Sequence, residues 1–167
     1  MTELTEEYVK SLFDYADGKL YWKISPSSRA AIGDVAGRIT TRGGYSCTKI
    51  NKKNYPIHRL IFFWHHGYLP ECIDHIDGDR FNNRIENLRM CSRAANAWNT
   101  KLRKDNKTGV KGLRYAKIKN YWFWIGTVKA YGHRLTKASK DRDVVIQWLI
   151  ETRERLHGEY ANHGAHQ

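Results

Sequence analysis

The amino-acid sequence predicts an α+β protein built of two modules. A strand, a loop, a second strand and a short helix are expected in order over residues 73–99. A polar, basic stretch without periodicity separates them from three short strands and one amphipathic helix in residues 110–156. The predicted organisation is a first module over residues 1–100 with its core at about 72–99, a linker over 101–108, a second module over 109–160 and a tail over 161–167.

The first module is expected to begin with a helix from Thr5 to Phe13. Val9, Leu12 and Phe13 recur at helical spacing, and Thr5 has the side chain of an N-cap. Asp17-Gly18 predicts a turn, and residues 59–65 predict a short buried helix that ends before Gly67 and Pro70. Further strands are expected at 20–22, 35–41 and 45–50, the last followed by a turn at 51–53.

The second module is expected to contain three strands and a closing helix. The strands are predicted at 110–114, 121–128 and 134–136. The helix is predicted over 141–156 with Ser139 as N-cap, and residues 161–167 are expected to be frayed. Side chains alternate between the two faces of the central strand, with Trp122 and Trp124 on one face and Phe123 on the other. One of these faces should pack on Trp148 and Leu149 of the helix.

The charge indicates a polyanionic partner. Lys and Arg number 29 against 17 acidic residues, which gives a net charge of +12. Thirteen of the basic residues lie in 101–142, where the acids are Asp105 and Asp141. Because this excess is concentrated in one part of the chain, it favours a nucleic-acid-binding surface over a uniformly charged coat.

Location and redox state are expected to be ordinary for a cytoplasmic protein. The start of the chain is acidic, unlike a secretory signal, and the apolar runs are shorter than a membrane span. Cys47, Cys72 and Cys91 are spaced like neither a disulfide framework nor a CxxC zinc site. We therefore expect reduced thiols, no membrane partner and a cytoplasmic location.

Residues 73–99 hold the densest set of polar side chains in the sequence. Asp74 and His75 are adjacent, so in a strand they point to opposite sides. A helix returning after the hairpin could bring Asn96 beside Asp74, and aspartate and amide oxygens suit a hard cation such as Mg²⁺. His75, neutral near pH 7, could then take a proton from water. A single histidine is more often structural than catalytic, so the hypothesis depends on the whole set.

This segment resembles the HNH homing-type endonucleases of phages and introns. The resemblance rests on Asp74-His75-Ile76-Asp77-Gly78-Asp79, Asn82-Asn83-Arg84-Ile85-Glu86-Asn87-Leu88-Arg89, Asn96, Asn99 and the upstream Ile57-His58-Arg59-Leu60. It implies a ββα-metal fold and hydrolysis of DNA, with His75 as general base and Asn87 holding the loop that aims it. It also implies Asp74 and Asn96 as ligands of one Mg²⁺ or Mn²⁺ ion, and a structural role is favoured for His58.

Residues 108–160 resemble the AP2-like DNA-binding domains that accompany phage HNH nucleases. The matching pieces are Gly109-Val110-Lys111-Gly112, Tyr121-Trp122-Phe123-Trp124-Ile125 and Leu156-His157-Gly158-Glu159-Tyr160. Such a sheet can lie in the major groove, where lysines contact phosphates and arginines pair with guanine. The residues expected to contact double-stranded DNA are Arg59, Arg84, Lys111, Arg114, Lys117, Lys119, Lys129 and Arg134.

The function expected is that of a metal-dependent DNA endonuclease of site-specific nicking or homing type. A monomer, the expected state, has one active site, so nicking is the default. Three alternatives stay open: a non-catalytic sequence-specific DNA-binding regulator, a basic RNA-binding or assembly protein, and a zinc-stabilised HNH relative. Only the set Asp74, His75, Asn87 and Asn96 separates the nuclease from the regulator.

Overall fold

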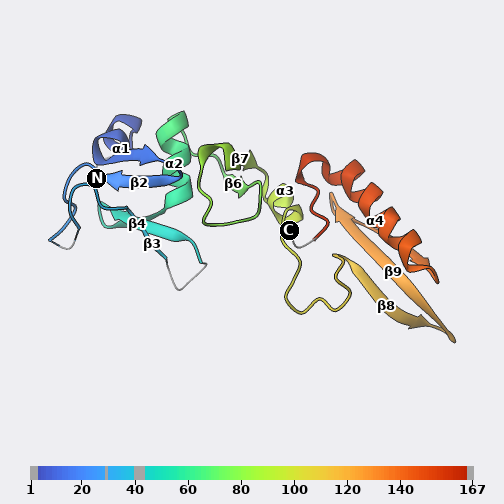
Figure 1. Cartoon of the computed structure of the whole chain (residues 1–167). Coiled ribbons are helices and arrows are strands. Elements are labelled where there is room, and N and C mark those ends of the chain that lie inside the picture. Colours follow the sequence, from blue (N-terminus) through green and yellow to red (C-terminus); the bar gives the residue numbers. More distant parts are fainter. Residues whose placement is uncertain (1–3, 29, 40–43, 165–167) are drawn as a thin grey trace. The chain divides into compact units, whose positions relative to one another are not determined.

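The computed structural model describes residues 4–28, 30–39 and 44–164, and its chain forms two compact units (Figure 1). The first unit is Met1–Cys91 and the second is Ser92–Gln167. The division falls directly after the second strand of the predicted core, ahead of the expected linker at 101–108. Parts of two sequence-based expectations, the hairpin turn at 40–43 and the last residues of the tail, lie outside the described residues.

In the part of the first unit that the structure describes, the chain forms three small antiparallel sheets and two α-helices. The sheets pair β1 with β2, β3 with β4 and β5, and β6 with β7. The elements are α1 (Glu6–Leu12), β1 (Phe13–Ala16), β2 (Lys19–Trp22), β3 (Arg38–Ile39), β4 (Ser46–Ile50), β5 (Lys53–Pro56), α2 (Ile57–His66), β6 (Cys72–His75), the 3₁₀ turn η1 (Ile85–Asn87) and β7 (Leu88–Cys91).

The core of the first unit lies between α1, α2 and the first hairpin. Val9, Leu20, Leu60 and Ile61 are fully buried there. Thr5 caps α1 as predicted, since its side chain accepts a hydrogen bond from the backbone N–H of Tyr8. The expected helix 59–65 is part of the longer α2, which starts directly after Pro56.

The β4–β5 hairpin places α2 and was only partly predicted. The expected turn at 51–53 is confirmed, because Asn51 and Lys52 both have positive φ, as a two-residue hairpin turn requires. The strand that follows, β5, was missed. Its pattern is polar and it ends at Pro56, so it lacks the alternation by which a strand is recognised in sequence.

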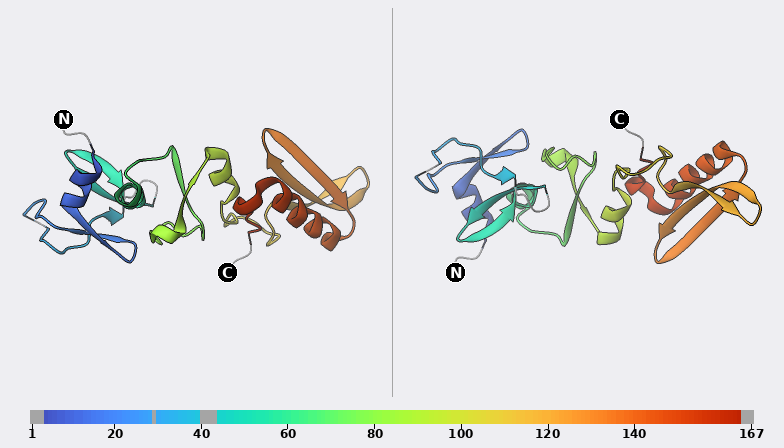
Figure 2. Two further views of the ribbon diagram at one scale, coloured as in Figure 1. Left: turned by 90° about the horizontal axis from the view of Figure 1, so that it is seen from above. Right: turned by 90° about the horizontal axis from the view of Figure 1, so that it is seen from below.

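The second unit is a three-stranded antiparallel sheet in the order β10-β9-β8 with one long helix beside it. The helix α4 lies along β9 in both Figure 1 and Figure 2. The elements are α3 (Arg93–Trp98), β8 (Leu113–Ile118), β9 (Tyr121–Ala130), β10 (His133–Ser139), α4 (Arg142–His157) and the 3₁₀ turn η2 (Gly158–Tyr160).

A small residue in the central strand lets α4 approach the sheet closely. A Cβ atom added at Gly126 would lie 2.8 Å from Val145 and 3.0 Å from Leu149. Val145 and Leu149 are fully buried, and Trp124 and Trp148 pack against the same cluster. We expected one set of alternate residues in β9 to pack on α4. This is confirmed for the set that contains Trp124.

Three expectations for the second unit are wrong in detail. The first strand begins at Leu113 rather than Val110, because residues 106–112 form turns closed by the side chains of Asn106 and Thr108. Asp141, not Ser139, caps α4 and accepts hydrogen bonds from the N–H groups of residues 143 and 144. Residues 161–164 are held in place, since Asn162 donates to Asn99 and Gly164 is buried.

The three cysteines are free thiols, as expected. Cys72 and Cys91 lie opposite each other in the β6–β7 ladder. Burial, together with the neighbouring Cys72, raises the pKa of Cys91 to about 12, so this thiol stays protonated. None of the helices in the described parts of the chain has the length and apolar character needed to cross a membrane.

Candidate active site

The β6–β7 hairpin presents the two residues at the centre of the predicted site. Asp74 lies opposite Arg89 and His75 lies opposite Leu88 in the antiparallel register. Asp74 is 4% exposed and His75 is 5% exposed, so both side chains are held within the protein rather than on its surface. Buried polar groups of this kind require partners, and the partners define the site.

The Asp74 carboxylate is paired with the guanidinium of Arg89. Asp74 Oδ2 accepts hydrogen bonds from Arg89 Nε at 3.1 Å and from a terminal nitrogen of the same guanidinium at 3.0 Å. The Arg89 side chain is 15% exposed and the Asp74 side chain 5%, so solvent screens the pair only weakly. The pair fixes the carboxylate at the end of β6 and balances its charge.

The imidazole of His75 is oriented by an amide from the loop that follows β6. His75 Nε2 lies 2.9 Å from Asn83 Oδ1, and Asn83 is itself 7% exposed. An amide oxygen only accepts hydrogen bonds, so Nε2 carries the proton in this arrangement and Nδ1 carries the lone pair. Nδ1 is then the atom of His75 that can accept a proton.

Two further rings pack around His75. Its ring centroid lies 5.2 Å from that of His58 and 6.3 Å from that of Tyr45, and Arg80 lies over the Tyr45 ring. His58 is 8% exposed. Burial and the nearby His75 and Arg59 lower the pKa of His58 to about 3. His58 is therefore a neutral ring at physiological pH and fills space beside His75, as the structural role favoured from the sequence requires.

Asn87 closes the loop between β6 and β7. Its Oδ1 accepts from the backbone N–H of Asp77, and its Nδ2 donates to Asp77 Oδ1 at 2.9 Å and to the Asn82 carbonyl at 2.7 Å. Its backbone carbonyl accepts from the N–H of Ile76. Partial burial opposes ionisation of Asp77, but hydrogen bonds from Asn82, Asp79 and Asn87 and the nearby His75 lower its pKa overall. Asn87 thus ties down the residues directly after His75.

The Asp74 carboxylate is an oxygen ligand of the kind that a hard cation prefers, and its partner in the structure is the Arg89 guanidinium. One carboxylate with a few amide or water oxygens is a common way to hold Mg²⁺, which keeps most of its water ligands. Among the residues that the structure describes, no group of three or more His, Cys, Asp or Glu side chains forms a metal cluster. A site with a single carboxylate would not form such a group. Asn96 lies on α3 in the second unit, so its pairing with Asp74 stays a prediction.

The predicted DNA contacts of the first unit differ in accessibility. The Arg59 guanidinium donates to the carbonyls of Pro70 at 2.8 Å and Glu71 at 3.3 Å, which gives it a structural role in holding the segment before β6. The Arg84 side chain is 61% exposed in a loose ion pair with Asp17, so it can reach a ligand. Arg84 is accordingly the better candidate of the two for contacting DNA.

The predicted DNA contacts of the second unit fall into three groups. Arg114, Lys129 and Arg134 have the parity of Ile125 and lie on the sheet face opposite α4. Lys117 is opposite Trp122 and lies on the other face, and Lys119 is in the β8–β9 turn with φ 52°. Lys111 donates to the carbonyls of Trp98 and Thr100, and burial followed by the nearby Arg153 lowers its pKa to about 8.

Several residues of the site were not assigned from the sequence. From the sequence, Asn83 and Arg89 were recognised only as parts of the motif, and Tyr45 only as part of a predicted strand. The strand register and the fold of the 77–84 loop bring them to Asp74 and His75. One available signal was the position of Arg89 in the second strand, since a hairpin centred on residues 81 and 82 pairs it with Asp74.

Comparison with known proteins agrees with this site. Residues 55–98 match the HNH endonuclease family, a range that includes α2, the β6–β7 hairpin and α3. The chain is 42% identical over 89 residues to Protein 3.8 of Escherichia phage T7, an alignment that covers 53% of this chain and 72% of the phage protein. No solved structure matches the chain. With this sequence match and a buried Asp-His pair on a hairpin closed by an asparagine, the chain belongs to the HNH endonuclease family.

Proposed function

We propose that the protein is a metal-dependent endonuclease that hydrolyses phosphodiester bonds of double-stranded DNA, as a site-specific nicking or homing-type enzyme. The observation that carries the proposal is the environment of His75, whose Nε2 is held by Asn83 while a neutral ring packs beside it. An imidazole fixed in one tautomer, with its other nitrogen able to accept a proton, has the properties of a general base.

Each residue of the hairpin then has a role in the reaction. His75 takes a proton from the attacking water at Nδ1, and Asn83 holds the ring at Nε2. His58 stays uncharged, so it does not oppose the positive charge that forms on His75. Asn87 keeps the loop after His75 closed. The resemblance to the family assigns Asp74 and Asn96 as ligands of one Mg²⁺ or Mn²⁺ ion, which when bound would offset charge on the scissile phosphate.

DNA binding is assigned to the second unit as an AP2-like domain. Arg114, Lys129 and Arg134 share one face of its sheet, as a surface that lies in a groove requires. One active site in a monomer cuts one strand, so the expected product is a nick. Because a similar protein is encoded by a phage, the proposed location is the cytoplasm of a host cell.

The decisive test is relaxation of supercoiled plasmid by the purified chain. We expect nicked product with Mg²⁺ or Mn²⁺ and none with a chelator. His75→Ala should lower the rate by at least about 100-fold, the lower range of general base contributions. His133→Ala, a histidine exposed on β10, is the matched control and should cut at the rate of the unmodified protein.

The same assay distinguishes the nuclease from a non-catalytic DNA-binding regulator. If the chain binds duplex DNA but leaves the plasmid supercoiled with every divalent metal tested, a non-catalytic DNA-binding regulator replaces the nuclease. If His75→Ala cuts as fast as the unmodified protein, a nuclease remains but the role of His75 is wrong. Thermal unfolding of each variant shows whether a loss of cutting reflects a loss of folding.

A further inference from the structure

The second unit carries three aromatic rings on the α4 side of its sheet, Tyr115, Trp122 and Trp124, here called the aromatic platform, in which Tyr115 contacts both tryptophans. The centroid of the Tyr115 ring lies 5.1 Å from that of Trp122 with 16° between the planes, and 4.6 Å from that of Trp124. The strand register places Tyr115 directly opposite Trp124 and diagonal to Trp122. The three rings therefore form one cluster across β8 and β9, in which Tyr115 and Trp122 stack on each other.

The helix covers only one end of the platform. Val145 and Leu149 lie over Gly126, and Arg142, in the first turn of α4, lies 5.5 Å from the Trp124 ring. Trp122 is two residues further along the same face, beyond this first turn. Consequently Trp122 is 53% exposed and Tyr115 is 50% exposed. Large rings that lie together and remain exposed are typical of a binding surface.

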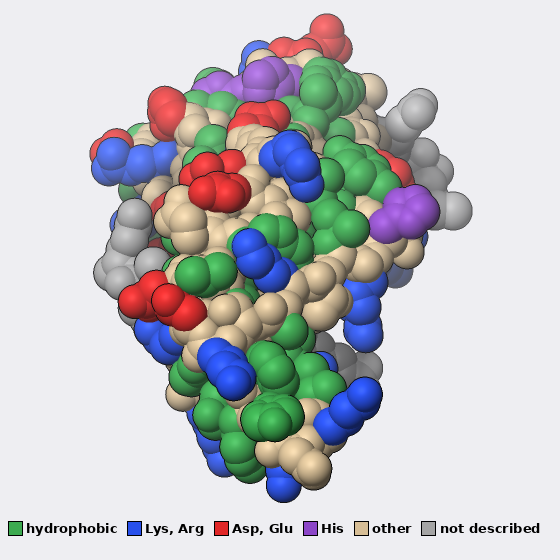
Figure 3. Space-filling model, turned by 90° about the vertical axis from the view of Figure 1, so that its right-hand side faces the viewer, with side chains coloured by type: hydrophobic (Ala, Val, Ile, Leu, Met, Phe, Trp, Pro, Cys, Tyr) green, Lys and Arg blue, Asp and Glu red, His purple; other side chains and the backbone are tan. Residues whose placement is uncertain are grey.

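The charge around the platform is positive. Lys117 is the direct neighbour of Trp122 across the strands, and Arg142 approaches Trp124 from the helix. In the lower part of Figure 3, a group of hydrophobic side chains is bordered by Lys and Arg side chains. An apolar surface with a cationic border fits a ligand that combines flat rings with negative charge.

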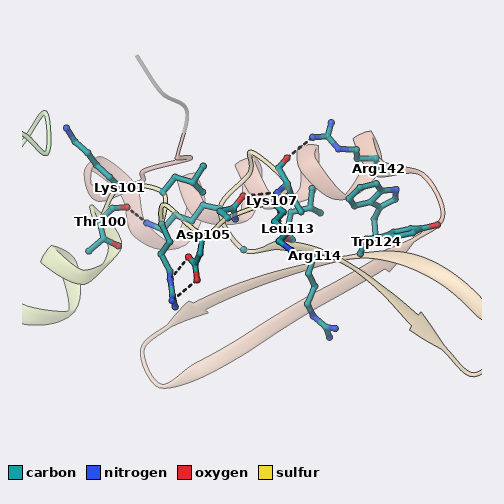
Figure 4. A pocket seen from close by; sticks show the side chains of 15 residues that line it. Thr100, Lys101, Asp105, Lys107, Leu113, Arg114, Trp124 and Arg142 are labelled. Atoms are coloured by element: carbon teal, nitrogen blue, oxygen red, sulfur yellow. Dashed lines mark hydrogen bonds and ion pairs between the residues drawn. The ribbon is translucent and has the colours of Figure 1, made fainter.

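A cavity of about 1190 Å³ adjoins the platform, with Tyr115 and Trp124 in its wall. Figure 4 shows Trp124 extending toward Arg142, while Arg114 points to the other side of the strands. Among its lining residues the only acid is Asp105, which is paired with Arg103 at 2.9 Å. The basic residues in the lining are Lys101, Arg103, Lys107, Lys111, Arg114 and Arg142.

We propose that the aromatic platform and the adjoining cavity bind unpaired nucleotides of single-stranded DNA. Exposed rings bind bases by stacking on their flat faces, and those faces are accessible only where the duplex is open. The lysines and arginines of the cavity other than Arg114, which points to the other side of the sheet, then bind the phosphates that link the bases. This site lies on the α4 side of the sheet, apart from the duplex-binding face proposed for Arg114, Lys129 and Arg134.

The test measures binding of fluorescently labelled thymidine decamer to the full chain by anisotropy, in chelator so that cleavage has no part. Trp122→Ala should bind the decamer at least about fivefold more weakly, the lower range for loss of one stacked base. A duplex of the same length should keep its affinity within about twofold. The matched control is Tyr131→Asn, which removes an exposed ring at the β9–β10 end of the sheet, where φ is 51° and asparagine is well tolerated.

A decamer of abasic sites separates stacking from charge, since it keeps the phosphates and lacks the bases. The unmodified protein should bind it about as weakly as Trp122→Ala binds the thymidine decamer. Equal affinity for abasic and thymidine strands, or an equal loss of duplex and single-strand binding in Trp122→Ala, would overturn the proposal. So would tighter binding of a uridine decamer, which would assign the platform to RNA, or a change of oligomeric state in the variant, which would assign it to self-association.

Discussion

Two imidazole rings that pack against each other in the active site should not both carry a positive charge. The rings of His58 and His75 have centroids 5.2 Å apart in a buried environment, where two positive charges would repel strongly. The structure meets this condition through burial of His58, which lowers its pKa to about 3. Only His75 is then left to gain a proton in the proposed reaction.

The low pKa of His58 predicts a loss of stability in mild acid. Between pH 6.5 and 3 the unfolded chain binds a proton at His58 that the folded chain excludes, so stability falls as the pH is lowered through this window. At pH 5 the expected loss is about 2 kcal/mol relative to neutral pH. Urea unfolding at pH 7 and pH 5, on the full chain and on His58→Gln, measures it.

The glutamine variant isolates this effect from the other histidines whose pKa is lowered, namely His65, His157 and His163. The difference in unfolding free energy between the two pH values should shrink by most of the expected amount in His58→Gln. An unchanged difference would mean that the folded protein accepts a proton on His58 at pH 5.

The residues of the site differ in how far the sequence could predict them. Asp74, His75 and Asn87 stand in a dense polar motif, so they could be chosen before the fold was known. Asn83 could not be distinguished from its neighbour Asn82, because only the path of the loop decides which amide reaches His75. Arg89 needed the register of β6 and β7, which is a property of two strands rather than of one segment.

At the scale of elements, the start of α4 shows how two neighbouring residues can compete for one role. Ser139 and Asp141 both have capping side chains. Asp141 accepts from the N–H groups of residues 143 and 144, while Ser139 accepts only from the N–H of Asp141. Because β10 continues as far as Ser139, the chain cannot begin the helix earlier, and the cap moves to the next suitable residue.

Removing the cap should destabilise the second unit more than removing the serine hydroxyl. Asp141→Ala should cost about 1 kcal/mol, since it also removes a negative charge at the positive end of the helix dipole. Ser139→Ala should cost less, because it leaves both capping hydrogen bonds in place. Chemical unfolding of the two variants decides between them, and equal losses, or a larger loss in Ser139→Ala, would contradict the assignment of the cap.

Most elements could be predicted, whereas the faces they present could not. The long helix, the active-site hairpin and the central strand follow from strong apolar periodicity. Lys117 and Arg114 were both expected to contact DNA, but they are three positions apart in β8, so they point to opposite sides of the sheet. These faces could not be assigned because β8 was expected to end at Arg114, which left Lys117 in a turn.

At the scale of the whole molecule, the net charge of +12 requires that DNA binding depend strongly on salt. The proposed duplex-binding face predicts which lysines contribute. Lys129→Ala should lower the slope of log affinity against log salt by about 0.9, the value for one phosphate contact. Lys117→Ala is a matched exposed lysine on the other face of the same sheet and should leave the duplex slope unchanged.

Titrations of a labelled duplex at several salt concentrations, in chelator, give both slopes. If Lys117→Ala changes the slope and Lys129→Ala does not, the duplex lies on the α4 side of the sheet. In that case the α4 side of the sheet binds duplex DNA and the opposite face is left for unpaired DNA.

The pairing of Asp74 with Arg89 bears on when the enzyme would acquire its ion. A carboxylate already neutralised by a resident guanidinium attracts a free dication weakly, so the protein alone is expected to hold Mg²⁺ poorly at cellular concentrations. Phosphate oxygens from bound DNA would supply the missing negative charge. The ion and the DNA strand would then bind together, and the enzyme would remain inactive until DNA is bound.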